Sequence, residues 1–137
     1  MIRHVILDTG PLVAALDASE AHHRWATEQF KTIRLPLITC EAVVTEACHL
    51  LRRSERAVAQ VGDYLSRGVI ECRCALPDDG GRVFDLVRKY RDVPMSLADA
   101  CLVYLVEITD GSCVFTLDAH FNVYRQLNRR VIPTIAP

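Results

Sequence analysis

Residues 5–16 read VILDTGPLVAAL and contain an apolar run, a carboxylate and the start of a helix. The first three residues of this stretch are typical of a strand that is covered on both faces. Asp8 ends the run, and Pro11 is tolerated in the first turn of a helix. A second apolar run, residues 114–117, ends at Asp118 in the same way. The sequence therefore predicts two buried strands that each end in an acid.

Strand-like and helix-like runs alternate along the whole chain, and residues such as Ser54 and Ser96 are typical helix caps. This alternation predicts an α/β fold, a three-layer α/β/α sandwich around a short, mostly parallel central sheet. Because the chain has 137 residues and no repeat or linker, we expect residues 1–137 to form a single domain. The expected strands are 3–7, 35–38, 69–75, 112–117 and 130–134, and the expected helices are 11–16, 19–31, 40–53, 54–68, 78–90, 96–108 and 120–127.

The composition indicates a globular protein with one sizeable core, since 50% of the residues are hydrophobic and 24% are charged. No run of 18 apolar residues predicts a membrane span, and the N-terminus lacks a signal-peptide pattern, so we expect a cytoplasmic protein. The net charge of -1 provides no strong basic field for nucleic acid. Of the 16 basic residues 14 are Arg, which indicates either phosphate contacts or simply the base composition of the genome.

The six cysteines form no CxxC pair, and no histidine pair has the spacing of a zinc site. We interpret them as reduced residues, mostly in the core, because a free cysteine behaves as a small hydrophobic side chain.

Four carboxylates have apolar neighbours in the sequence, namely Asp8, Glu46, Asp99 and Asp118. Each has a structural explanation by itself. The two strand-end acids can cap the following helix, Glu46 can reach water from the edge of its helix, and Asp99 follows Ser96 in a capping-box pattern. Buried charges must nevertheless be paired, protonated or bound to a metal. Together the four acids therefore predict an acidic crevice for Mg²⁺ or Mn²⁺ and suggest a metal-dependent phosphodiesterase.

Four segments in order resemble the motifs of PIN-domain ribonucleases, and in particular those of VapC-type toxins from toxin–antitoxin pairs. These segments are residues 6–14, 43–51 around Glu46, 95–100 around Asp99, and 115–121 around Asp118. The resemblance covers essentially the whole chain. Each motif is weak alone, but four in the same order and spacing are specific.

This resemblance implies a PIN-like fold, Mg²⁺ or Mn²⁺ in the crevice, and endonuclease cleavage of RNA. The family's metal-binding acids correspond to Asp8, Glu46, Asp99 and Asp118, and its polar residue two positions before the last acid corresponds to Thr116. Three of these acids would be direct ligands, and Glu46 would act through a water or hold a second ion. A small antitoxin is the expected partner, and we expect a homodimer. The RNA target is left open.

Further polar residues have candidate roles around this site. Thr9, Ser96 and Thr116 are candidates to orient water or phosphate, although capping and strand hydrogen bonds also explain them. Three arginines near the end of the Glu46 helix are candidates to guide RNA phosphates, although a solvated helix face explains them equally well. They are Arg52, Arg53 and Arg56.

Two other functions fit parts of the sequence. The tripeptide from Asp8 to Gly10 occurs in aspartic proteases, but that fold is all-β, and this chain is expected to be rich in helices. The PIN-like fold is also compatible with a module that binds RNA or a partner without cleavage. Replacing Asp8 or Asp99 with Asn would separate the two, because a nuclease would lose activity and a binding module would not.

Overall fold

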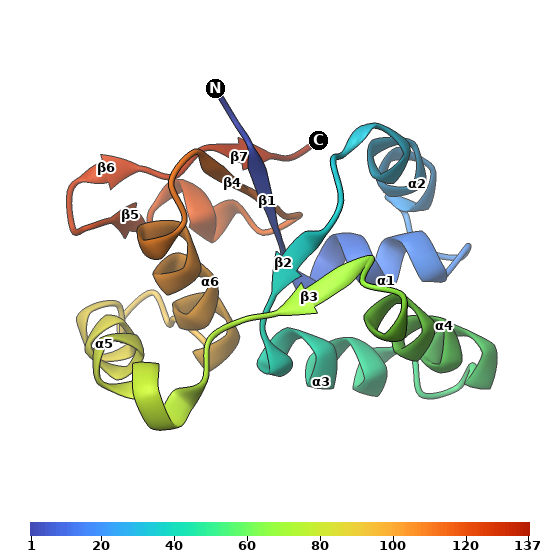
Figure 1. Ribbon diagram of the computed structural model, residues 1–137, viewed down its shortest axis with the longest axis horizontal. Coiled ribbons are helices and arrows are strands. Elements are labelled where there is room, and N and C mark those ends of the chain that lie inside the picture. The colour runs from blue at the N-terminus through green and yellow to red at the C-terminus, as the bar shows by residue number, and fades with distance from the viewer.

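The computed structural model describes residues 1–137, and a five-stranded parallel sheet with strand order β3-β2-β1-β4-β7 forms its middle layer (Figure 1). The strands are β1 (His4–Leu7), β2 (Leu37–Thr39), β3 (Ile70–Cys72), β4 (Ser112–Phe115) and β7 (Thr134–Ile135).

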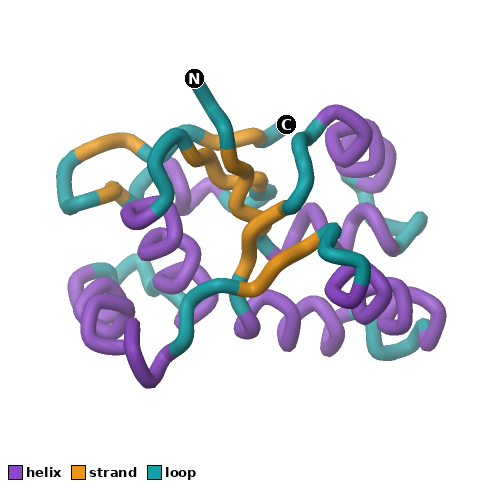
Figure 2. The backbone as a smooth tube through the Cα atoms, in the orientation of Figure 1, coloured by secondary structure: helices purple, strands orange, loops and turns teal.

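Helices cover both faces of this sheet, as the colouring of Figure 2 shows. Helices α5 and α6 lie on one side, and α1, α2 and α4 lie on the other (Figure 1). The predicted α/β/α sandwich is therefore confirmed. The helices are α1 (Thr9–Leu16), α2 (His23–Thr32), α3 (Glu41–Leu50), α4 (Glu55–Ser66), α5 (Leu76–Lys89) and α6 (Leu97–Ile108).

Alternating side chains of each strand build two separate cores. Ile6 of β1 faces the core beneath α5 and α6, whereas Val5 and Leu7 face the core beneath α1 and α4. This alternation follows from the two-residue period of a strand. Helix α3 contributes Val43 to the first core and Ala47 to the second, so it links the two.

Several predicted boundaries were wrong. Ser19 does not begin a helix, because its amide and hydroxyl both donate to the Asp17 carboxylate, and α2 begins at His23. Helix α5 begins at Leu76, ahead of the predicted acidic start, because Pro77 is tolerated in its first turn. The ends of the remaining strands and helices differ from the prediction by at most three residues.

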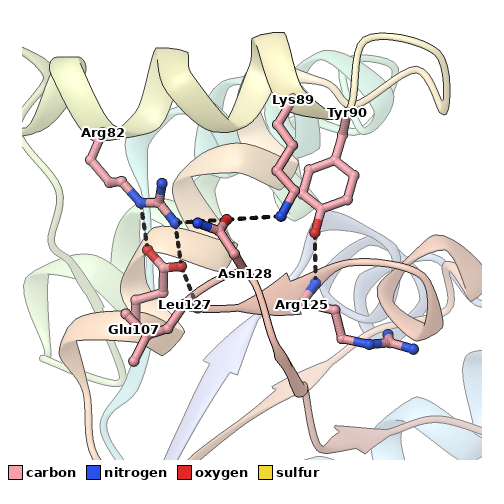
Figure 3. A network of polar contacts seen from close by, with 7 residues as sticks. All are labelled: Arg82, Lys89, Tyr90, Glu107, Arg125, Leu127 and Asn128. Carbon is pink, nitrogen blue, oxygen red and sulfur yellow. Dashed lines mark hydrogen bonds and ion pairs between the residues drawn. The ribbon is translucent and has the colours of Figure 1, made fainter.

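The largest error concerns residues 120–127, which were predicted as a helix. Only a single 3₁₀ turn, η1 (Ala119–Asn122), forms there, and a hairpin of β5 (Arg125–Gln126) and β6 (Arg130–Val131) follows. The predicted strand 130–134 is consequently divided between β6 and β7. The cause is tertiary, because two amides that a helix would use donate to side chains instead: Arg125 N to Tyr90 Oη and Leu127 N to Glu107 (Figure 3).

All six cysteines are free thiols, as predicted. Only three are fully buried, however, and Cys48, Cys72 and Cys74 are half-buried. None of the helices combines the length and the hydropathy that a membrane span requires.

Candidate active site

The site lies where the order of the sheet reverses. Strand β1 pairs with β2, the next strand in the chain, on one side and with β4 on the other. The strand order therefore changes direction between β1 and β4. In open α/β sheets, ligands bind at such a point beyond the carboxyl ends of the strands. Leu7 of β1 pairs with Phe115 of β4, so the residues that follow them, Asp8 and Asp118, leave the same edge of the sheet.

Two helices supply the other acids. Asp99 lies in the first turn of α6, where its amide donates to the Ser96 hydroxyl over 3.0 Å. Asp99 is only 9% exposed, on a helix that is apolar on nearly all sides. Glu46 lies on α3 and is exposed, which agrees with the alternative that it reaches water from the edge of its helix. The face of α3 that is buried contains Val43 and Ala47, and Glu46 lies at its edge.

Hydrogen bonds hold the acids in place. The Thr116 hydroxyl donates to Asp8 Oδ2 over 2.6 Å and accepts from the Asp118 amide over 2.8 Å, so one buried side chain joins both strand-end acids. The Thr9 hydroxyl donates to Glu46 Oε2 over 3.2 Å. Both strand-end aspartates also cap the next turn, since Asp8 accepts from the Thr9 amide and Asp118 from the His120 amide. Asp8 and Asp118 therefore cap the following turns and also belong to the site.

One cavity of about 570 Å³ brings together all four predicted acids, and Thr9 and Ser96 also line it. Thr116 lies behind the wall and is 1% exposed. Gly10 allows the start of α1 to approach the end of β4, because a Cβ atom there would lie 3.2 Å from Cβ of Leu117. The lining residues are Asp8, Thr9, Gly10, Glu46, Leu50, Pro94, Ser96, Asp99, Leu117, Asp118 and His120.

Two residues of the site were not predicted from the sequence. The buried Tyr124 hydroxyl donates to Asp99 Oδ2 over 2.9 Å. Nδ1 of His120 lies 3.1 Å from Asp118 Oδ1 at the mouth of the cavity. His120 lies within the fourth motif, two residues after Asp118, and that position was its only signal. Nothing in the sequence links Tyr124 to Asp99, because their contact depends on the hairpin that follows η1.

The cavity disfavours the ionised form of its carboxylates when no cation is nearby. Burial first, and then the charges of Asp99 and Asp118, raise the pKa of Asp8 to about 6 against the hydrogen bonds from Thr116 and Thr9. Burial also raises the pKa of Asp99, with a smaller contribution from Asp118, while the Tyr124 hydroxyl opposes the shift. No lysine or arginine forms an ion pair with any of the four acids.

These features fit a hard divalent cation, for which carboxylate oxygens are the preferred ligands. A cation would relieve the repulsion that raises the carboxyl pKa values. The acids are not, however, already drawn together into a ligand set, because no three His, Cys, Asp or Glu side chains lie in metal-holding positions. A bound ion would have to draw the carboxylates closer together.

The predicted RNA-contacting arginines are divided in space. Arg52 and Arg53 line a separate cavity of about 470 Å³, which adjoins the acidic cavity at the shared residue Leu50. Arg56 is exposed on α4 and does not line that cavity.

The PIN domain family matches this chain over residues 5–127, which include all four acids. The chain belongs to the PIN-domain family. Ribonuclease VapC26 of Mycobacterium tuberculosis is 30% identical to this PIN-domain protein over 129 residues, which cover 90% of this chain and 93% of the relative. The crystal structure of VapC20 of Mycobacterium tuberculosis, a toxin that cleaves the sarcin-ricin loop, superposes with a TM-score of 0.77 at 19% identity. That match covers 92% of this chain and 98% of VapC20 and shows a shared fold.

Proposed function

We propose that this PIN-domain protein is a metal-dependent endoribonuclease and the toxin of a type II toxin–antitoxin pair. The observation that carries the proposal is the cavity with four carboxylates and no paired lysine or arginine, at the edge of the sheet where ligands bind. The relative VapC26, a ribonuclease by name, supports RNA as the substrate. Mg²⁺ or Mn²⁺ suits an all-oxygen site of this kind.

Asp8, Asp99 and Asp118 are the proposed ligands, and the exposed Glu46 would hold a water or a second ion. A bound divalent ion would supply an activated water and neutralise charge on the phosphate. The other residues position these acids. Thr116 fixes two of them, Tyr124 orients Asp99, and Thr9 orients Glu46. The hydroxyl of Ser96, exposed at the cavity, already accepts from the Asp99 amide and retains capacity to donate.

RNA would enter past Arg52 and Arg53, whose cavity adjoins the acidic cavity. Arg56 would contact phosphates farther along the RNA strand. Exposed apolar side chains offer surfaces for a small antitoxin or a second copy of the chain. The half-buried Trp25 of α2 is a weak candidate for that surface, since its ring packs on Phe115 at 5.5 Å. The cytoplasmic location and the homodimer stay predictions.

The test is cleavage of a labelled pool of total RNA by the purified protein with Mg²⁺, with Mn²⁺ and with EDTA. We expect discrete cuts that require metal, and mapping them would identify the target. Asp99→Asn should abolish them, because a neutral amide is a poorer ligand and does not attract the cation. Asp110→Asn is the matched control, since Asp110 is an exposed acid that precedes β4, at the other end of that strand.

Cleavage that persists in EDTA or in Asp99→Asn would overturn the proposal. A folded protein that binds RNA equally well with and without Asp99, and never cuts, would instead indicate a binding module.

A further inference from the structure

Four of the six cysteines line a second cavity of about 470 Å³. Cys40 is the N-cap of α3, Cys72 ends β3, Cys74 lies in the connection to α5, and Cys101 lies in the middle of α6. None of the four acids of the proposed active site lines this cavity. The fold therefore gathers thiols from three separate places in the chain, because Cys72 and Cys74 are only two residues apart.

Cys101 lies at the centre of the cluster. Its thiol acts to lower the pKa of the Cys40 thiol and that of the Cys74 thiol. A disulfide between two of these residues would need their Cα atoms within about 7 Å of each other. Cys40 and Cys101 contribute side chains to the same core, which fixes the backbones on either side of their contact.

The surroundings of Cys40 favour its thiolate. Its pKa is lowered by the hydrogen bond from Cys101 first, and then by the backbone amides of Val43 and Ala42 in the first turn of α3, against the effect of burial. Amides at a helix N-terminus are a common means of activating a cysteine. By contrast, burial raises the pKa of Cys72 and that of Cys113 to about 11.

A small reagent can reach this pair. Cys40 and Cys101 are only 1% and 3% exposed, but both lie in the wall of a cavity with ample room for a peroxide molecule. Large thiol reagents would meet the half-buried Cys72 and Cys74 first.

We propose that Cys40 and Cys101 form an oxidisable thiol pair that hydrogen peroxide converts reversibly into a disulfide across the cavity. In the first step the Cys40 sulfur attacks one peroxide oxygen, the O–O bond breaks, and Cys40 sulfenic acid and water form. In the second step the Cys101 sulfur attacks the sulfenic sulfur, the S–O bond breaks, and the S–S bond and a second water form. The two thiols lose two electrons, and the peroxide accepts them.

The pairing can be mapped cleanly in a Cys48→Ser/Cys113→Ser background. In that variant, trypsin places each remaining cysteine on its own peptide: residues 35–52, 68–73, 74–82 and 92–125. The full-length protein is treated with hydrogen peroxide, blocked with iodoacetamide under denaturing conditions and analysed by mass spectrometry. We expect two thiols to escape alkylation, an intact mass lower by about 2 Da before alkylation, and a link between peptides 35–52 and 92–125 that dithiothreitol reverses.

Two further variants test the order of the steps. In Cys101→Ser, the sulfenic acid of Cys40 should accumulate and be trapped by dimedone, whereas Cys40→Ser should yield no disulfide and no adduct at Cys101. The wild-type chain, which needs no core substitution, should also lose two of its six thiols. Four alkylated cysteines in the mapped variant after peroxide, or a link that involves Cys74 in place of Cys40, would overturn the proposal.

Discussion

The carboxylate of Asp8 has two short hydrogen bonds and almost no contact with water. Its oxygens accept from the Thr9 amide over 2.7 Å and from the Thr116 hydroxyl over 2.6 Å, and the residue is 6% exposed. These two bonds do not offset the cost of burying the charge beside Asp99 and Asp118, and the pKa of Asp8 rises to about 6. In the metal-free protein the ionised form is therefore a source of instability that a cation would remove.

Asp8→Asn should accordingly stabilise the metal-free protein at neutral pH. A carboxyl group whose pKa is raised on folding favours the fold fully below its unfolded pKa, near 4, and this contribution is lost as the pH rises through 6. We expect the variant to be more stable than wild type by about 1–3 kcal/mol at pH 7.5, with no such gain below pH about 4. Urea unfolding in EDTA measures this difference.

Mn²⁺ should reverse the ranking, because it should stabilise the wild type and have little effect on the variant. Asp110→Asn should show no such pH-dependent gain. A less stable Asp8→Asn protein in EDTA at pH 7.5 would contradict this account of the acidic cavity.

The sequence indicated which acids to examine, but it did not predict how each is buried. Asp8 and Asp99 are buried as their apolar neighbours suggested, whereas Glu46 is exposed. The helical pattern predicts on which side of a helix a residue lies, but not how far burial extends around the helix. The exposure of Glu46 could therefore be known only from the packed structure. The metal-binding roles of all four acids stay predictions.

At the scale of elements, one carboxylate fixes the hairpin that follows η1. Glu107 of α6 accepts from Arg82 Nε over 2.9 Å, from Arg82 Nη2 over 2.7 Å and from the Leu127 amide over 2.7 Å (Figure 3). Its side chain is 4% exposed, and Asn128 extends the network to Lys89. The network joins α5, α6 and the hairpin next to Tyr124, the partner of Asp99.

Glu107→Gln should lower the free energy of unfolding by about 1–3 kcal/mol, because the two ionic contacts with Arg82 become one contact with a neutral amide oxygen. Asp85→Asn is the control, since its pair with Arg88 is exposed on both sides and should contribute less than about 1 kcal/mol. Urea unfolding of both variants gives the comparison. Equal losses from the two substitutions would show that the network is not specifically stabilising.

Local signals predicted most elements and failed at the hairpin. Ser54 and Ser96 cap α4 and α6 as expected, with hydroxyls that accept from Ala57 and Asp99 amides. Such caps are visible in the sequence because donor and acceptor lie three residues apart. The contacts that stop a helix over residues 120–127 span 20 and 35 residues, so no local pattern reveals them.

At the scale of the whole molecule, strand order creates the site. Asp8 and Asp118 are 110 positions apart in the chain, yet they adjoin because β4 pairs directly with β1. The sequence predicted a parallel sheet with acids at strand ends, but not which strands are neighbours. The match of the PIN domain family confirmed the family resemblance. The strand pairing itself required the structure.

The central claim is that acids from four elements act as one catalytic unit on RNA. Its most direct test is single-turnover cleavage of the mapped RNA site, with Mn²⁺ present, by wild type, Asp8→Asn, Asp99→Asn and the double variant. Each single variant should lose at least about a thousandfold in rate, and the double variant should be scarcely slower, because residues that act as a unit are not additive. Two modest losses that multiply in the double variant, or a rate that EDTA does not change, would contradict the account.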